Sequence, residues 1–296
     1  MKRKIAAFLA LLISFNGMAE TNTQIAAEKR AFIQALVTHD HFDRAALTTL
    51  IFSLQPNEKI INTMTKPFEK QPWSYYRHFF LTSERIELGA QYLKTHHHEL
   101  MQLQRKYGIP ASIITAIIGV ETEYGRHLGK YYVLDALFTL GFYYPDREKF
   151  FRKELGEYLV LTRDNHLPLR SIKGSYAGAL GIPQFMPSSY RHFGVSTTPD
   201  GRVDLFNNAD AIASVANYFH QNGWHANQPI AHQLSAKPDS LQNGAKLTTL
   251  PMKNGNEYWA TYPNFNVIMT YNHNVVYAMA VYQLSRAIEK QYDQKL

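Results

Sequence analysis

The segment Ile113–Arg126, IITAIIGVETEYGR, most strongly constrains the fold, because it predicts a buried helix that ends beside a carboxylate. Pro110 suits the first helical turn, and Gly125 suits the left-handed residue that often follows a helix. Glu121 lies three, four and seven positions after isoleucines, so it shares a helix face with an aliphatic stripe. The segment therefore predicts a helix of about four turns that carries Glu121 near its end.

A carboxyl group on such a face is expected to be partly desolvated. Desolvation disfavours the charged form and raises the pKa, as a general acid that works near neutral pH requires. The alternative is a helix-end glutamate that is solvated or paired with Arg126. The helix alone does not separate these interpretations, so the rest of the chain must decide.

The first nineteen residues predict export. Lys2, Arg3 and Lys4 precede an apolar run that is too short to cross a membrane, and Gly17-Met18-Ala19 supplies the small residues of a cleavage site. We expect a signal peptide over residues 1–19. No later stretch is long and apolar enough to span a bilayer, and the chain has no cysteine for disulfides or lipid attachment. We therefore expect a soluble exported protein with neither a transmembrane segment nor a lipid anchor.

The composition of the expected mature chain suits a carbohydrate better than a nucleic acid. Removal of the three charges at Lys2, Arg3 and Lys4 lowers the formal net charge from +7 to +4, and no dense Lys/Arg stripe remains. We therefore do not expect nucleic-acid binding. Aromatic residues make up 13%, including 19 tyrosines, whose flat faces and polar tips suit sugar rings, although most will be packed inside the protein.

Most of the chain has a helical pattern, so the predicted fold class is predominantly α (α+β). Expected helices cover residues 23–54, 82–107, 133–141, 208–224 and 271–284. Thr82 or Ser83 is expected to cap the second of these helices and Gly108 to end it, and Asp146 is expected to cap a further helix. Residues 231–266 are polar with short β-type pieces. The consecutive His96, His97 and His98 fan around their helix, so we interpret them as surface residues instead of metal ligands.

The most distinctive stretch is KGSYAGALGIPQFMPSSY at residues 173–190. Its glycines and alanines let the backbone approach another group closely, and Ser175 and Gln184 offer neutral hydrogen-bonding groups. A tight contact between helices would also explain the small residues. It would not explain Gln184 held between two prolines.

Together with GVETEYG around Glu121, SVANYF at 214–219 and MTYNH at 269–273, this stretch resembles the lytic murein transglycosylases of the B type. The resemblance covers roughly residues 73–284. It implies a periplasmic enzyme acting on peptidoglycan, with a lysozyme-like helical core, an N-terminal helical lobe and a small β-containing lobe. We expect the lobe at 20–108, the core at 109–230 with 267–296, and the β lobe at 231–266.

The resemblance also assigns roles by position. Glu121 matches the single catalytic acid/base, and a larger set matches residues that bind the glycan: Ser175, Gln184, Tyr218, Tyr271, Asn272, Tyr76 and Arg147. Many relatives have a second arginine beside the position of Arg147, where this chain has Asp146.

Residues 196–207 resemble the twelve-residue calcium loop of some relatives. The candidate ligands are Ser196, Thr198, Asp200 and Asp204, but the last position is Asn207, which cannot supply a bidentate carboxylate. We therefore expect no calcium, and no other metal or organic cofactor.

The implied reaction needs one carboxylate, whereas glycoside hydrolysis usually needs two. Glu123 lies about 200° around the helix from Glu121 and is not expected to share its site. Glu121 would protonate the β-1,4 bridging oxygen between N-acetylmuramic acid and N-acetylglucosamine, then act as base on the C6 hydroxyl to give a 1,6-anhydro end. The alternatives are a lysozyme-like hydrolase and an inactive peptidoglycan-binding scaffold. Glycan strands are the expected partner, with other cell-wall enzymes as further candidates.

Overall fold

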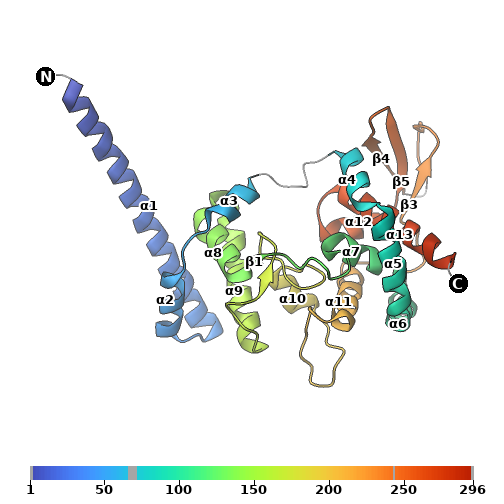
Figure 1. The fold of residues 1–296 in the computed structure, drawn as a ribbon, viewed down its shortest axis with the longest axis horizontal. Helices are drawn as coiled ribbons and strands as arrows, with labels where there is room; N and C mark the ends of the chain where they lie inside the picture. Colours follow the sequence, from blue (N-terminus) through green and yellow to red (C-terminus); the bar gives the residue numbers. More distant parts are fainter. Residues whose placement is uncertain (1–2, 66–71, 243, 295–296) are drawn as a thin grey trace.

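The computed structural model describes residues 3–65, 72–242 and 244–294, with side chains from Asn22 onward. Helices form most of the chain, as predicted, and they group into two packing units with a small sheet at one edge (Figure 1). The predicted signal segment lies at the start of α1, where no side chains are described. No helix in the described ranges is long and apolar enough to cross a membrane.

The first unit, here called the helical lobe, joins the start of the chain to its middle. Helices α8 and α9 pack against each other and against α1, α3 and α10. Its elements are α1 (Arg3–Asp40), α2 (Arg44–Ser53), α3 (Glu58–Met64), α8 (Val133–Tyr143), η2 (Pro145–Arg147), α9 (Glu148–Asp164) and α10 (Pro187–Phe193).

The second unit, here called the core, surrounds α7 and α13, which pack against each other and against α5. Its elements are α4 (Trp73–Phe80), α5 (Ser83–Thr95), α6 (His97–Tyr107), α7 (Ala111–Thr122), α11 (Asn208–Gln221), α12 (Pro263–Tyr271) and α13 (Val275–Asp293). The expected lobe at 20–108 is therefore divided, because α4 to α6 pack with the core and α1 to α3 with the other unit.

The small sheet lies within the predicted 231–266 region. Strand β5 (Asn256–Thr261) runs between β3 (Ala231–Leu234) and β4 (Lys246–Pro251), antiparallel to both, and pairs Trp259 with Gln233 and Thr248. A two-residue ladder joins β1 (Tyr131–Tyr132) to β2 (Lys173–Gly174), and so brings the glycine-rich stretch beside the segment that follows α7.

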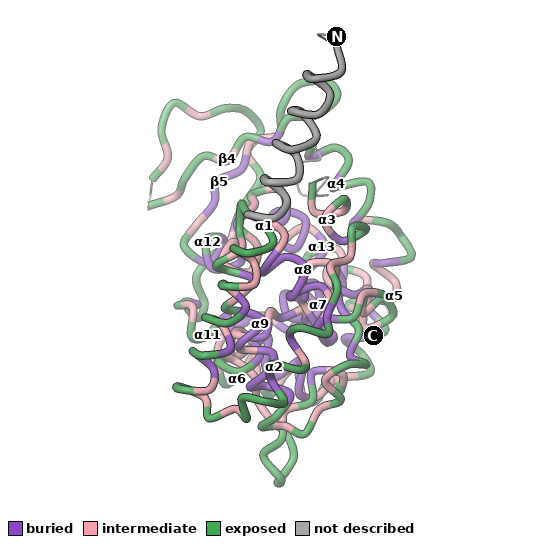
Figure 2. Tube along the Cα trace, turned by 90° about the vertical axis from the view of Figure 1, so that its left-hand side faces the viewer, coloured by how far each residue is buried: buried purple, intermediate pink, exposed green. Residues whose placement is uncertain are grey.

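Helix α7 is more deeply buried than its sequence pattern predicted. Eleven of its 12 residues are buried, so it is enclosed on all sides and not only along one stripe (Figure 2). The helix also ends earlier than expected. Glu123 already has a left-handed backbone with φ of 50°, two residues before Gly125.

Other expected boundaries need correction. The helix predicted over 82–107 breaks at His96 into α5 and α6, although Thr82 and Gly108 cap its outer ends as predicted. Asp146 lies in the short η2 turn, and α9 starts without a side-chain cap. The helix expected over 271–284 begins later, at Val275 of α13, because Tyr271 ends α12, and α13 continues to Asp293.

Candidate active site

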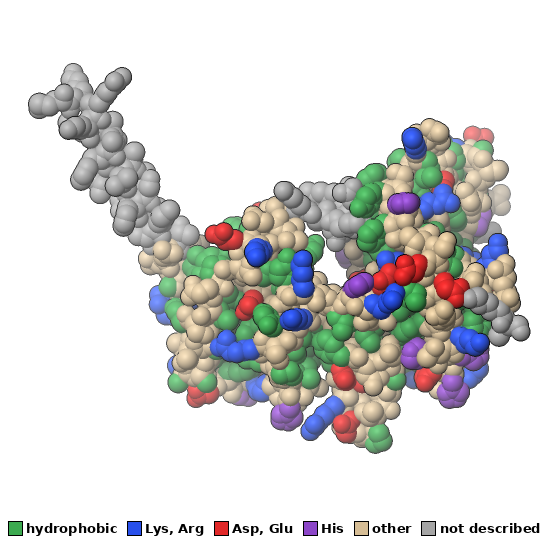
Figure 3. All heavy atoms as spheres, in the orientation of Figure 1, with side chains coloured by type: hydrophobic (Ala, Val, Ile, Leu, Met, Phe, Trp, Pro, Cys, Tyr) green, Lys and Arg blue, Asp and Glu red, His purple; other side chains and the backbone are tan. Residues whose placement is uncertain are grey.

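Glu121 lies in the last turn of α7, above isoleucines that are fully buried. Its side chain is partly exposed, in agreement with the predicted half-desolvated carboxylate. The hydroxyl of Tyr277 donates a hydrogen bond to Glu121 Oε1 at 2.5 Å. In space-filling view the surface is indented between the helical lobe and the core, and α7 lies next to this indentation (Figure 3, compare Figure 1).

Tyr277 was not among the predicted site residues. It is the third residue of α13 and is 4% exposed. Burial, followed by the nearby charge of Glu121, raises the pKa of Tyr277 well above its ordinary value. The phenol therefore stays protonated and keeps its proton available for Glu121. The sequence signal for it was its position four residues after the MTYNH stretch that contributes to the resemblance.

Ser175 shapes the glycine-rich loop. Its Oγ accepts hydrogen bonds from the backbone N–H groups of Ala177 and Ala179, at 3.2 and 3.0 Å. Gly178, with φ of 86°, lies so close to Leu137 that a Cβ would be 2.3 Å from Cδ2. Gly178 therefore serves a close contact between this loop and α8, and not the contact between helices that was the alternative interpretation.

Gln184 lies in a tight turn, with φ of 49°. Its Nε2 donates to Gly181 O at 2.9 Å and to Leu128 O at 3.3 Å. Because both N–H donors of the amide are used within the protein, the amide oxygen is the group that can face a ligand.

Tyr218 and Tyr271 connect this turn to Glu121. The hydroxyl of Tyr271 donates to Pro183 O at 2.6 Å, and that of Tyr218 to Thr270 O at 2.7 Å. Their rings meet edge to face with centroids 4.9 Å apart. Burial, then the charge of Glu121, raises the pKa of Tyr271 well above its ordinary value. Asn272, next in the chain, is partly exposed at the end of α12.

Tyr76 and Arg147 are the other two residues to which the resemblance assigned a glycan contact. Tyr76 is 1% exposed and packs against Phe80, so its ring offers no surface to a glycan in this arrangement. Arg147 is exposed in η2, with its guanidinium 4.4 Å from the ring centre of Phe150. Neither contact involves Glu121, and the glycan-binding roles of both residues stay predictions.

The neighbouring carboxylates and cations have other partners. Glu123 lies 3.4 Å from Arg85 Nη2 and 2.9 Å from His127 Nε2, which is consistent with its predicted separation from the site of Glu121. Arg126, the alternative partner for Glu121, lies 3.5 Å from Glu84.

The candidate calcium loop is held by the buried carboxylate of Asp210, which was not among the predicted site residues. Asp210, 2% exposed, accepts hydrogen bonds from Thr197 N, Thr197 Oγ1 and Asp204 N at 2.6 to 2.8 Å. Within the loop, Thr198 Oγ1 donates to Asp200 Oδ1 at 2.6 Å. Across the described ranges, no group of three or more His, Asp or Glu side chains could hold a metal ion. Loop shape is thus maintained by protein hydrogen bonds.

The three consecutive histidines diverge, as predicted. The His96 ring packs on Tyr92, His97 Nδ1 is 3.0 Å from Tyr292 Oη, and His98 Nε2 is 3.3 Å from Gln102.

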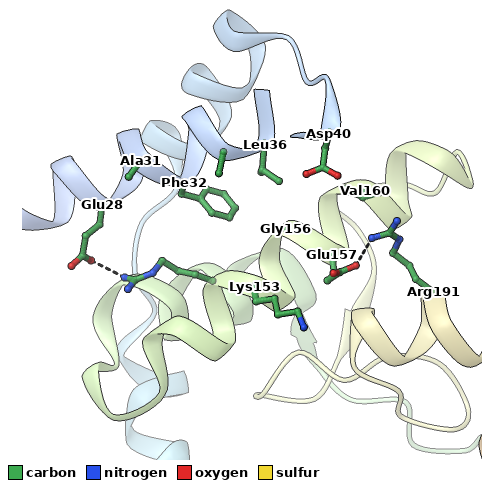
Figure 4. A pocket seen from close by; sticks show the side chains of 12 residues that line it. Glu28, Ala31, Phe32, Leu36, Asp40, Lys153, Gly156, Glu157, Val160 and Arg191 are labelled. Atoms are coloured by element: carbon green, nitrogen blue, oxygen red, sulfur yellow. Dashed lines mark hydrogen bonds and ion pairs between the residues drawn. The ribbon is translucent and has the colours of Figure 1, made fainter. Parts of the chain in front are cut away.

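A separate pocket of about 410 Å³ lies in the helical lobe, between α1 and α9 (Figure 4). Its floor is apolar, with Phe32 and Leu36 facing Gly156, and ion pairs of Glu28 with Arg152 and of Glu157 with Arg191 border it. It shares no residue with the site around Glu121.

Comparisons with known proteins agree with the fold. The family model described as "Transglycosylase SLT domain" matches residues 24–286. The chain is 35% identical to membrane-bound lytic murein transglycosylase B of Escherichia coli over 293 residues, which cover 87% of this chain and 81% of that protein.

Two solved structures are also similar. The soluble lytic transglycosylase SltB1 of Pseudomonas aeruginosa is 36% identical with a TM-score of 0.82, over 89% of this chain and 99% of that one. The Escherichia coli lytic transglycosylase Slt35 in complex with calcium is 34% identical with a TM-score of 0.83, over 90% of this chain and 94% of that one. The resemblance inferred from the sequence motifs is confirmed: this chain belongs to the SLT transglycosylase family.

Proposed function

We propose that this protein is a lytic transglycosylase that cleaves the β-1,4 bond between N-acetylmuramic acid and N-acetylglucosamine in peptidoglycan and forms 1,6-anhydromuramic ends. The observation that carries the proposal is the Tyr277–Glu121 hydrogen bond at 2.5 Å, at a partly exposed helix end beside Tyr271 and the Gln184 turn. Family membership and the murein named for the Escherichia coli relative support the substrate.

In this mechanism Glu121 first gives a proton to the bridging oxygen. The bond breaks, and positive charge develops at C1 of the muramic ring. The ionised Glu121 then removes the proton from the C6 hydroxyl of the same sugar, whose oxygen attacks C1 and closes the anhydro ring. The C6 hydroxyl of the substrate is thus the nucleophile, in the place of the water molecule that a hydrolase uses. One carboxylate serves both steps.

The predicted glycan contacts divide into two kinds. Gln184 would accept a hydrogen bond from an acetamido N–H through its amide oxygen, because its two donors are already used. Ser175 would act mainly by holding the shape of the glycine-rich loop, and Tyr218 by packing against Tyr271. The further predicted glycan contacts are Tyr271, Asn272, Tyr76 and Arg147. We propose no metal or organic cofactor.

The export pattern at residues 1–19 supports a periplasmic location, where peptidoglycan lies, and other cell-wall enzymes are proposed as additional partners.

Mass spectrometry of products from purified sacculi tests this function. Fragments with anhydro ends are expected, and fragments heavier by one water with a reducing end would instead show a lysozyme-like hydrolase. Glu121→Gln should abolish release of either product. Unchanged release by this variant would refute the assignment of the acid, and no release by the wild-type chain would favour the binding scaffold.

A further inference from the structure

The backbone just after Glu121 has an unfavourable conformation that other contacts must stabilise. Glu123, Tyr124 and Gly125 are three consecutive residues in the left-handed region, with φ of 50°, 62° and 85°. Two of them carry side chains, for which this conformation is unfavourable. Such strain persists only where surrounding contacts fix it.

Arg85 of α5 supplies one such contact. It is 9% exposed, and its Nη1 donates to Gly119 O at 2.6 Å while its Nη2 lies 3.4 Å from Glu123 Oε1. Its Nε is buried with no hydrogen-bond partner in the described part of the chain. Burial of a guanidinium group costs desolvation free energy, and the carbonyl and carboxylate groups at the end of α7 offset part of this cost.

Tyr124 fixes the same turn from inside. Its hydroxyl donates to Arg85 O at 2.8 Å. The ring occupies space left by two glycines, since a Cβ on Gly89 or Gly119 would lie 2.4 or 2.6 Å from the Tyr124 hydroxyl. The turn is therefore wedged between α5 and α7.

The opposite side of the turn is tied to the glycine-rich loop. Thr122 Oγ1 donates to Ile182 O at 2.8 Å, and Gly125 N donates to Thr122 Oγ1 at 3.0 Å. Ile182 lies two residues before Gln184. Glu121 thus directly precedes a segment that is fixed both to α5 and to the loop that carries a predicted glycan contact.

We propose that Arg85, Glu123 and Tyr124 are positioning residues that hold the end of α7 so that the Glu121 carboxyl group meets the glycosidic oxygen. None of the three contacts the reacting atoms in this proposal. They act by fixing the backbone around the acid. A displacement of a catalytic group by about 1 Å can lower a rate about a hundredfold, so loss of one contact has a measurable effect on turnover. The inference rests on the proposed function, because it assigns these residues to the same acid.

Steady-state cleavage of purified glycan strands tests the proposal. Tyr124→Phe removes only the hydroxyl that bonds to Arg85 O, and Glu123→Gln removes the charge opposite Arg85 while keeping the side-chain shape. We expect each to lower kcat about 5- to 20-fold and to leave KM within about twofold, as expected for one lost hydrogen bond or ion contact that acts on the acid alone.

Three further variants separate positioning from general stability. Arg85→Lys keeps the charge and should retain more kcat than Arg85→Met. Glu28→Gln breaks a comparable ion pair, with Arg152 at 2.7 Å in the helical lobe, and should leave kcat unchanged. Circular dichroism and thermal unfolding identify any variant that has lost its fold, and Tyr124→Phe, the smallest change, then decides the result.

The proposal is overturned if either folded Tyr124→Phe or folded Glu123→Gln keeps wild-type kcat, or if Glu28→Gln lowers kcat as much as they do. Failure of the proposed function is a different result, since wild-type protein would then release no anhydro products.

Discussion

Replacement of Tyr277 by phenylalanine removes one oxygen atom and, with it, the hydrogen bond to Glu121 Oε1. The bond is made to the carboxylate by a donor, so it favours the ionised form of Glu121. A hydrogen bond to a charged group contributes about 1.5 to 3 kcal/mol. Each pKa unit corresponds to about 1.36 kcal/mol. Without this hydrogen bond, Glu121 should therefore keep its proton up to a pH that is about 1 to 2 units higher.

The alkaline limb of the kcat profile, where the acid loses its proton, should therefore move upward in Tyr277→Phe by about 1 to 2 pH units. Tyr277 itself does not produce this limb, because burial and the charge of Glu121 raise its pKa well above its ordinary value. We also expect a lower plateau, by about tenfold, since the carboxyl group loses a contact that orients it. The assay is release of anhydro-muropeptides from sacculi, measured from acid to alkaline pH.

Tyr282→Phe is the matched control. Tyr282 is on the same helix and also donates a hydroxyl hydrogen bond of 2.5 Å, but to Ala231 O in strand β3 of the small sheet. Loss of the Tyr282 hydroxyl should leave the pH profile of kcat unchanged. An alkaline limb that stays fixed or moves downward in Tyr277→Phe would refute the reasoning, as would an equal shift in the control.

Three further results are expected. Gly178→Ala forces a Cβ against Leu137 at a left-handed position and should cost about 3 kcal/mol, lowering the Tm by about 5 °C in thermal unfolding. Asp210→Ala leaves the Thr197 and Asp204 donors unpaired and should cost about 3 kcal/mol, measured by urea unfolding. Calcium at millimolar concentration should shift the Tm by less than about 1 °C relative to EDTA, whereas binding with free calcium at 100 times the Kd would add about 2.7 kcal/mol.

Helix ends and the helix that carries Glu121 could be predicted from the sequence, because interactions between residues close in the chain determine them. Thr82 and Gly108 were identified as caps from residue type alone, and the structure shows the Thr82 side chain accepting from Arg85 N and a φ of 66° at Gly108. The helix that carries Glu121 was also predicted, because an uninterrupted aliphatic run between proline and glycine has few other solutions.

Features that depend on tertiary contacts were missed. The break at His96 interrupts a continuous helical pattern, where Tyr92 bonds to Asn208 of α11 and its ring meets His96. Tyr277 reaches Glu121 across 156 positions in the sequence, so no local pattern could have paired them. Both depend on how distant helices pack, which periodicity does not encode.

The Tyr277 contact also explains how one carboxylate can serve two opposite steps. A phenol hydroxyl both donates and accepts, so it can donate to the ionised Glu121 and stay bonded when that group carries a proton. Because burial keeps Tyr277 itself protonated, it does not compete with the substrate for the proton that Glu121 transfers. A second carboxylate in this place would repel the ionised acid and hold its proton too tightly for the first step. A buried tyrosine is thus better suited than a carboxylate to a site where the substrate's own hydroxyl replaces water.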